Sequence, residues 1–266
     1  MAPMHPNPEQ DVAEMILNAR KVVVFTGAGV STESGIPDFR SPGGYWEKYQ
    51  PIMYHDFLTS AEARKEQWRR STERYLAFAE AKPNAAHLAV AELERIGKLD
   101  CVITQNIDGL HQKAGNSPDQ VIELHGTNQW VVCLDCGKRY PAAEIQARLE
   151  AGVEIPTCHS CKGILKQATI SFGQPMPERE TQEAEVRSRD CDLCIVIGSS
   201  LVVYPAAYMP LYAQENGAKL VIINIQPTEF DHLAEVVIHE KAGPVMERIV
   251  QRVVARVQPY PLPPAP

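Results

Sequence analysis

The sequence predicts an α/β fold: a Rossmann-like parallel sheet with helices on both faces, interrupted by a loop with a helical segment and by a small inserted module. Short β-branched runs alternate with amphipathic helical patterns, which indicates a parallel sheet covered on both sides. The first run leads directly into Gly27-Ala28-Gly29, as in strands that precede a phosphate-binding turn. The alternation stops in a stretch that contains two cysteine pairs, and this stretch predicts the module.

The predicted elements follow one another from residue 11 onward. The spacing of apolar residues predicts helices over 11–20 and 244–257. Asn84 as N-cap and Gly97 as terminator bound a helix over 84–96. Strands are predicted over 22–25, 101–105, 121–124, 193–197, 220–225 and 236–238.

We therefore expect a Rossmann-type domain from residues 11–125 and 166–257, with the loop and helical segment at 38–83. The module occupies 126–165, and tails occupy 1–10 and 258–266.

Composition narrows the class of protein. With 266 residues, 44% of them hydrophobic, the chain can form one large domain with a small insertion. A net charge of −7 argues against a dedicated nucleic-acid partner. No apolar run is long enough for a transmembrane helix, and the first residues lack the features of a secretory signal, so we expect no membrane partner. The cysteine usage fits a reduced, cytoplasmic protein.

The glycine turn departs from the dehydrogenase pattern. The usual third glycine is replaced by Thr32, and the acidic ribose ligand expected after a second strand is missing. We therefore expect a dinucleotide bound in a different way. In the continuation, Arg40 is a natural phosphate partner, and Asp38 and Phe39 lie where a loop could close over a reactive carbon.

Polar side chains follow several predicted strands at their carboxyl ends, where open α/β sheets bind ligands. One strand ends in Gln105-Asn106-Ile107-Asp108, and the next delivers His125 to the same edge, with Gly126 leaving space beside it. An imidazole there can act as a general base near neutral pH. We interpret His111 as structural. Two further strand ends offer hydrogen-bonding groups, at Gly198-Ser199-Ser200 and Asn224-Ile225-Gln226.

The cysteine pairs Cys133-x-x-Cys136 and Cys158-x-x-Cys161 have the spacing of a zinc ribbon. Four thiolates complete a tetrahedral shell, so the zinc is expected to be structural. Cys191-x-x-Cys194 overlaps a predicted strand, where residues three apart face opposite sides and cannot share a metal. We interpret Cys194 and Cys101 as core residues.

Taken together, these motifs resemble the sirtuins, which are NAD-dependent protein-lysine deacylases. The resemblance covers about residues 12–255 and rests on GAGVSTESGIPDFR, TQNIDGLH, the His-Gly after VIEL, the paired cysteines, FGQPMP, GSSLVVYPAA and the strand end at Asn224. It implies NAD as co-substrate, one structural Zn²⁺, and acylated lysines of proteins bound as extended peptides. It also implies a cleft between the Rossmann domain and the zinc module.

The resemblance implies a reaction and its residues. The acyl oxygen attacks the ribose carbon as nicotinamide leaves, and His125 activates a ribose hydroxyl that attacks the resulting imidate carbon. The products are nicotinamide, O-acyl-ADP-ribose and free lysine. The implied catalytic residues are His125 and Asn106. The NAD contacts expected from the motifs are Gly27, Ala28, Gly29, Ser31, Asp38, Phe39, Arg40, Gln105, Asn106, Ile107, Asp108, Gly198, Ser199, Ser200, Asn224, Ile225, Gln226 and Ala242. The expected peptide contacts are Ser171, Phe172, Gly173, Val202 and Val203.

The acyl group is expected to be uncharged. Relatives that remove succinyl or malonyl groups carry a Tyr-x-x-Arg pair on the helix after the cofactor loop. Here Arg74 falls near the arginine position, but Ser71 stands where the tyrosine belongs. Two departures concern contacts rather than activity: Gln174 replaces a frequent Glu, and Gly-Ser-Ser replaces Gly-Thr-Ser.

Alternative functions use the same features. Mono-ADP-ribosyl transfer to protein, or removal of longer acyl chains, would use the same site. A dehydrogenase would need the missing acidic ribose ligand. A non-catalytic NAD- and zinc-binding module would not need His125.

Overall fold

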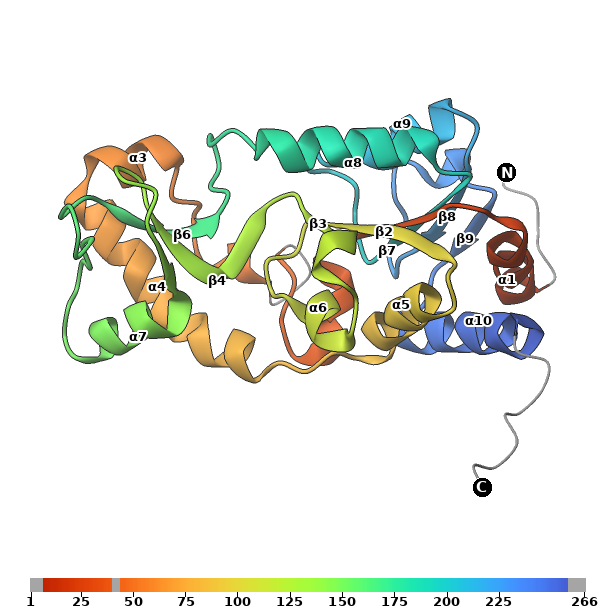
Figure 1. Ribbon diagram of the computed structural model, residues 1–266, viewed down its shortest axis with the longest axis horizontal. Coiled ribbons are helices and arrows are strands. Elements are labelled where there is room, and N and C mark those ends of the chain that lie inside the picture. Colours follow the sequence, from red (N-terminus) through yellow and green to blue (C-terminus); the bar gives the residue numbers. More distant parts are fainter. Residues whose placement is uncertain (1–6, 40–43, 258–266) are drawn as a thin grey trace, which may run out of the picture.

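A computed structural model describes residues 7–39 and 44–257 (Figure 1). Its main sheet has six parallel strands in the order β3-β2-β1-β7-β8-β9. Numbered along the chain within this sheet, the order is 3-2-1-4-5-6, the doubly wound order of the Rossmann fold. The strands are β1 (Val22–Thr26), β2 (Leu99–Thr104), β3 (Val121–Glu123), β7 (Leu193–Ile197), β8 (Lys219–Ile223) and β9 (Val236–Ile238). The fold class predicted from the sequence is confirmed.

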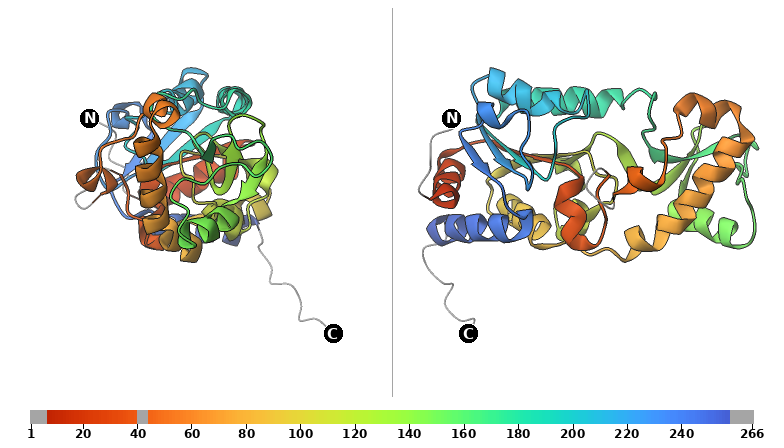
Figure 2. Two further views of the ribbon diagram at one scale, coloured as in Figure 1. Left: turned by 90° about the vertical axis from the view of Figure 1, so that its left-hand side faces the viewer. Right: turned by 180° about the vertical axis from the view of Figure 1, so that it is seen from behind.

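Helices cover both faces of this sheet (Figure 2). Alternate residues of β1 face opposite sides: Val22 and Val24 pack in one core, and Val23 and Phe25 in the other. The first core includes residues of α1 (Pro8–Asn18), α5 (Ala85–Arg95) and α10 (Ala242–Val257). The second includes residues of α8 (Glu178–Asp190) and α9 (Tyr208–Glu215). Because β1 is buried on both sides, its carboxyl end is a rigid support for a site.

A second, antiparallel sheet lies beyond the carboxyl ends of the parallel strands (Figure 1). Its order is β5-β4-β6, with β4 (Gly126–Cys133), β5 (Arg139–Pro141) and β6 (Leu165–Thr169). Helix α7 (Ala142–Glu150) completes the module. Strand β6 therefore continues past the predicted boundary at residue 165. The small core of this sheet includes Trp68 of the long helix α4 (Ala61–Glu80), which belongs to the segment predicted at 38–83.

Short elements connect these parts: α2 (Tyr45–Lys48), α3 (Tyr54–Thr59), α6 (Leu110–Ala114) and the 3₁₀ helices η1 (Ala28–Ser34), η2 (Pro118–Gln120) and η3 (Asp231–Leu233). The predicted loop after residue 38 thus contains one turn of helix. Among the described residues, no helix is both long and apolar enough to cross a membrane.

The first helix begins earlier than predicted. It starts at Pro8, inside the segment that we expected to be a tail. The Asn7 side chain accepts a hydrogen bond from the Gln10 amide at 3.3 Å, and Pro8 occupies a first-turn position where its missing N–H is not needed. Residues 258–266 lie outside the described part of the chain.

Candidate active site

A cleft of about 740 Å³ lies at the carboxyl ends of β1 and β7, where the strand order reverses, and it extends to the second sheet. Most of the predicted site residues line it. They are Gly27, Ala28, Gly29, Ser31, Asp38, Phe39, Gln105, Asn106, Ile107, Asp108, His125, Ser171, Phe172, Gly173, Gly198, Ser199, Ser200, Val203, Asn224, Ile225, Gln226 and Ala242. Arg40 lies outside the described residues. Val202 has an exposed side chain and is not part of the lining.

Three glycines interlock at the floor of the cleft. A Cβ on Gly27 or on Gly29 would lie 2.8 Å from the carbonyl oxygen of Gly198, and one on Gly198 would lie 2.2 Å from the amide nitrogen of Val30. The Gly29 amide donates to the Gly198 carbonyl at 2.8 Å. We expected Gly27 and Gly29 to let the backbone approach a pyrophosphate. The contacts show that the loops after β1 and β7 require them in order to pack against each other.

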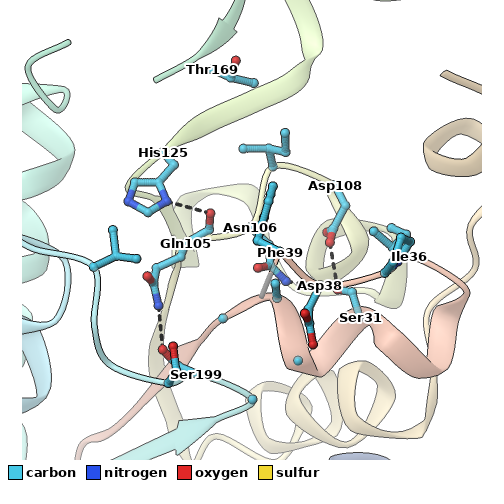
Figure 3. A pocket seen from close by; sticks show the side chains of 18 of the residues that line it. Ser31, Ile36, Asp38, Phe39, Gln105, Asn106, Asp108, His125, Thr169 and Ser199 are labelled. Carbon is cyan, nitrogen blue, oxygen red and sulfur yellow. Dashed lines mark hydrogen bonds between the residues drawn. The ribbon is translucent and has the colours of Figure 1, made fainter. Parts of the chain in front are cut away.

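A hydrogen bond joins His125 to the backbone of Gln105 (Figure 3) and holds the imidazole in a single tautomer. Its Nδ1 lies 3.0 Å from the backbone oxygen of Gln105, so Nδ1–H donates and Nε2 is left with its lone pair. Burial lowers the pKa of His125 below its usual value, against the opposing effect of the hydrogen bond to Gln105. The imidazole is therefore neutral at neutral pH, the protonation state that a general base needs.

Gly126, beside the histidine, has a different role from the one predicted. It has φ +70°, and a Cβ there would lie 2.1 Å from the carbonyl oxygen of Ala168. The space beside Gly126 is thus filled by the backbone of β6. The glycine brings the second sheet close to the end of β3, which forms the corner of the cleft.

A buried polar cluster orients Asn106 and Asp108 (Figure 3). The Ser31 hydroxyl donates to Asp108 Oδ2 at 2.8 Å and accepts from Asn106 Nδ2 at 3.0 Å. Because the amide nitrogen faces Ser31, the Asn106 oxygen points away from it. The backbone amide of Asn84 is 3.3 Å from His87 Nδ1, so His87 Nε2 carries the hydrogen and donates to Ser31 at 3.4 Å. Burial lowers the pKa of His87 to about 4, which keeps it neutral.

The remaining strand ends are also fixed by hydrogen bonds. Gln105 Nε2 donates to Ser199 Oγ at 2.9 Å, which joins the ends of β2 and β7 (Figure 3). At the end of β8, Asn224 Nδ2 donates to the backbone oxygen of Gln226 at 2.7 Å. The parallel sheet therefore presents pre-ordered amides and hydroxyls along the cleft, the groups that suit the hydroxyls and phosphates of a dinucleotide.

The segment predicted to bind peptide forms one wall. The backbone oxygen of Phe172 accepts from the amide of Tyr54 at 2.8 Å, and the Gln174 side-chain oxygen accepts from the amide of Ser171 at 3.2 Å. Gly173 has φ +80°, a conformation that a side chain would strain. Exposed Phe172 and Val202 border this part of the molecule.

Four cysteines form the only group of metal-ligating side chains found among the described residues. The Sγ atoms of Cys133, Cys136, Cys158 and Cys161 lie within 4.8 Å of one another, and two pairs are 3.5 and 3.7 Å apart. Zn–S bonds of about 2.3 Å in a tetrahedron place sulfurs about 3.8 Å apart, so the set fits zinc.

The two cysteine knuckles have matching backbone turns. Gly137 and Lys162, each directly after the second cysteine of its pair, have φ +71° and +64°. Each donates its amide to the carbonyl of the first cysteine of its pair at 2.9 Å. Tyr140 Oη lies 3.1 Å from Cys158 Sγ and can donate to the thiolate, a contact that supports the ligand from outside the metal shell.

The residues that we interpreted as structural are buried outside the group of four cysteines. Cys191 and Cys194 lie in the same core as Cys101. Cys191 is the C-cap residue of α8 and does not belong to β7. The argument that residues three apart in a strand face opposite sides therefore does not apply to this pair. His111 is buried on α6, where burial lowers its pKa to about 3.

One wall of the cleft was expected from the sequence only at Arg74. It is a stripe along α4, formed by Gln67, Arg70, Glu73, Arg74, Ala77 and Phe78. Helical spacing is the signal that could have shown that these residues share a face. Glu33 was also missed; its carboxylate accepts from the amide of Gly243 at 2.9 Å, which ties the glycine loop to α10.

Comparison with known proteins places these features in one family. The Sir2 family model matches residues 27–205. Over 232 residues the chain is 50% identical to NAD-dependent protein deacetylase 1 of Bradyrhizobium diazoefficiens, with 87% of this chain and 91% of that protein covered. It is 44% identical to NAD-dependent protein deacylase 2 of Archaeoglobus fulgidus, over 91% of this chain and 94% of the relative.

Solved structures agree with this result. One of a Sir2 enzyme matches with a TM-score of 0.84 and 43% identity, covering 94% of this chain and 98% of that one. Another, of Sir2 with p53 peptide and NAD⁺, matches with a TM-score of 0.83 and 37% identity, covering 91% and 97%.

Proposed function

Because the chain belongs to the Sir2 family, we propose that it is an NAD-dependent protein-lysine deacylase that acts mainly on acetyl-lysine. The observation that carries the proposal is the state of His125. Its imidazole is neutral, lines the cleft and is fixed in the tautomer that leaves Nε2 able to accept a proton. A non-catalytic binding module has no need of such a group, and a dehydrogenase would need the acidic ribose ligand that the sequence lacks.

In this proposal NAD is a co-substrate, held along the carboxyl ends of the parallel strands. The donors and acceptors at Ser199, Gln105 and Asn224 would bind the nucleotide, and Phe39 would exclude water from the reactive carbon. Asn106 and Asp108, ordered by Ser31, would orient the nicotinamide and its ribose. Arg40, as a phosphate ligand, remains a prediction from the motif.

His125 would act after nicotinamide has begun to leave. As nicotinamide leaves, the acyl oxygen bonds to the ribose carbon. His125 Nε2 would then take the proton of a ribose hydroxyl as that hydroxyl attacks the acyl carbon. Hydrolysis would release lysine and O-acyl-ADP-ribose. The acylated peptide would lie as an extended strand between Ser171–Gln174 and Val202–Tyr204, where backbone groups recognise it.

The four cysteines, with one zinc ion, would hold the second sheet together. The zinc would have no role in the chemistry, since four thiolates leave no open coordination position. Reduced cysteines and NAD chemistry both suit the cytoplasm, where we place the protein.

The test is incubation with NAD and an acetyl-lysine peptide, followed by mass spectrometry. Nicotinamide, deacetylated peptide and O-acetyl-ADP-ribose in equal amounts are expected. A mass gain of ADP-ribose on protein or peptide would indicate the transferase alternative instead. NADH, or no change, would refute the proposal.

A further inference from the structure

Three tyrosines form a row that leads from the cleft along α9. The ring centres of Tyr204 and Tyr208 are 4.8 Å apart, and those of Tyr208 and Tyr212 are 6.0 Å apart, with the latter pair stacked. The spacing of four residues places side chains on one side of a helix. Tyr204 precedes α9, but the turn there is already helical, since the Ala207 amide donates to the Val203 oxygen at 2.9 Å. We call these three residues the tyrosine row.

The row is exposed at its cleft end and anchored at the other. Tyr204 lines the cleft, and the exposed fractions of Tyr204 and Tyr208 are 49% and 41%. Tyr212 packs against the core of the sheet. Buried Ala206 and Ala207 hold the backbone beneath the exposed rings. Two adjacent exposed aromatic rings beside a proposed peptide groove form a preordered contact surface.

The surroundings of the row favour a cationic partner. The guanidinium carbon of Arg189 lies 4.1 Å from the centre of the Tyr212 ring, and Arg189 Nε donates to Glu185 Oε1 at 2.9 Å, so the inner end of the row already accepts a guanidinium whose charge is paired within the chain. Tyrosine ring faces attract cations, and the net charge of −7 favours a basic partner. An acylated lysine is neutral, so the cation must come from another residue of the substrate.

We propose that the tyrosine row is a docking surface for a basic segment of the acylated substrate, with an arginine or lysine near the acyl-lysine lying over Tyr208. The proposal rests on the proposed function, because it takes the bound partner to be an acylated protein. It predicts a preference that the backbone contacts of the peptide cannot provide, since these read main chain rather than side chains.

The experiment compares acetyl-lysine peptides that carry arginine, citrulline or norleucine at each flanking position in turn. Citrulline keeps the shape of arginine without its charge. Binding is measured by anisotropy of the fluorescein-labelled peptides, and kcat/KM is measured in parallel. At one flanking position at least, arginine should bind about two- to fivefold more tightly than citrulline, the effect of one exposed cation–π contact.

Tyr208→Ala should abolish this preference while leaving kcat on the citrulline peptide unchanged. Tyr208→Phe, which keeps the ring, should retain it. Equal binding of arginine and citrulline peptides at every position, an equally strong preference for norleucine, or an arginine preference that survives in Tyr208→Ala would each overturn the proposal. If the arginine preference is present but no peptide is deacylated, the docking surface stands and the proposed function fails.

Discussion

At the scale of the single residue, the state of one imidazole governs the proposed chemistry. The Gln105 carbonyl holds His125 through Nδ1, and burial favours its neutral form. Neither effect depends on a bound substrate, so the base is ready in the free protein. The partners of Ser31 are ordered in the same way, because each hydrogen bond in that cluster determines the direction of the next.

His125→Ala should reduce kcat by about 10²- to 10⁴-fold, the usual loss when a positioned base is removed. NAD binding, measured by calorimetry, should change little, because the strand ends that line the cleft are intact. His232→Ala, an exposed histidine on η3, is the matched control and should keep wild-type activity. A His125→Ala variant that keeps more than about a third of kcat would show that another group acts as base.

The pH dependence of kcat/KM should show an acid limb with an apparent pKa below 6.5, the ordinary value from which burial lowers His125. The neutral base is present above that pKa, so activity is full near neutral pH and falls as the imidazole gains a proton. Burial also raises the pKa of Glu123 to about 7, so Glu123→Gln is the control. An acid limb that lies above pH 7, or that disappears in Glu123→Gln, would show that the limb reports the Glu123 carboxyl group and not His125.

Acetyl and butyryl peptides should be better substrates than a succinyl peptide. Ser71 is buried and accepts a hydrogen bond from Gln167 Nε2 at 2.8 Å, so it offers no tyrosine hydroxyl to an acyl carboxylate. A carboxylate taken into the cleft without its full set of partners costs roughly several kcal/mol. The measurement is kcat/KM on matched peptides. A succinyl value equal to the acetyl value, lost in Arg74→Ala, would show that Arg74 suffices as the anion receptor.

At the scale of the element, glycines determine how closely strands and loops approach. Gly126 joins the end of β3 to β6 with φ +70° and no room for a Cβ. Gly217, after α9, has φ +90° but nothing within 4 Å of a built Cβ. Both positions require a positive φ, but only Gly126 lacks room for a Cβ. A comparison of the two therefore separates backbone strain from steric exclusion.

Gly217→Ala should lower the free energy of unfolding by about 1–2 kcal/mol, the cost of a left-handed conformation for a residue with a Cβ. Gly126→Ala should cost more, and it should also lower kcat, because the backbone of β6 must move away from the residue that follows His125. Urea unfolding measures the stability of both variants. Equal losses of stability with full activity in both would show that the contact with Ala168 yields easily.

At the scale of the whole molecule, helix α4 connects the metal module to the cleft. Trp68 is 2% exposed and packs in the module core with two of the cysteine ligands. Other faces of the same helix carry Gln67, Arg70 and Arg74 into the cleft. A zinc ion held by the four cysteines would therefore support one wall of the site from a distance, through this helix.

One zinc per chain is expected, and its removal by a chelator should unfold the second sheet and abolish activity while the parallel sheet remains folded. Hydrogen exchange should show loss of protection in β4, β6 and α4, with β1 and β7 unchanged. Cys133→Ser should lose zinc, whereas Cys191→Ser, which changes another buried thiol in the main core, should retain it. Purified protein without zinc, or with full activity after chelation, would contradict this.

The sequence by itself determined the fold class, the cysteine ligands and the strand ends at which the site forms. These depend on local patterns: the alternation of strands and helices, the Cys-x-x-Cys spacing, and polar residues directly after β-branched runs. Element ends were less certain, as the earlier start of α1 at Pro8 shows, because capping there uses a residue outside the apolar pattern.

Only the tertiary structure decided which distant residues meet. It showed that Gly27, Gly29 and Gly198 interlock, that Gly126 admits β6, and that α4 forms a wall of the cleft. It also placed Arg189 of α8 on the tyrosine row of α9. Each of these is a contact between segments far apart in the chain. Such contacts depend on how whole elements pack, and the local periodicity of a single sequence does not record that packing.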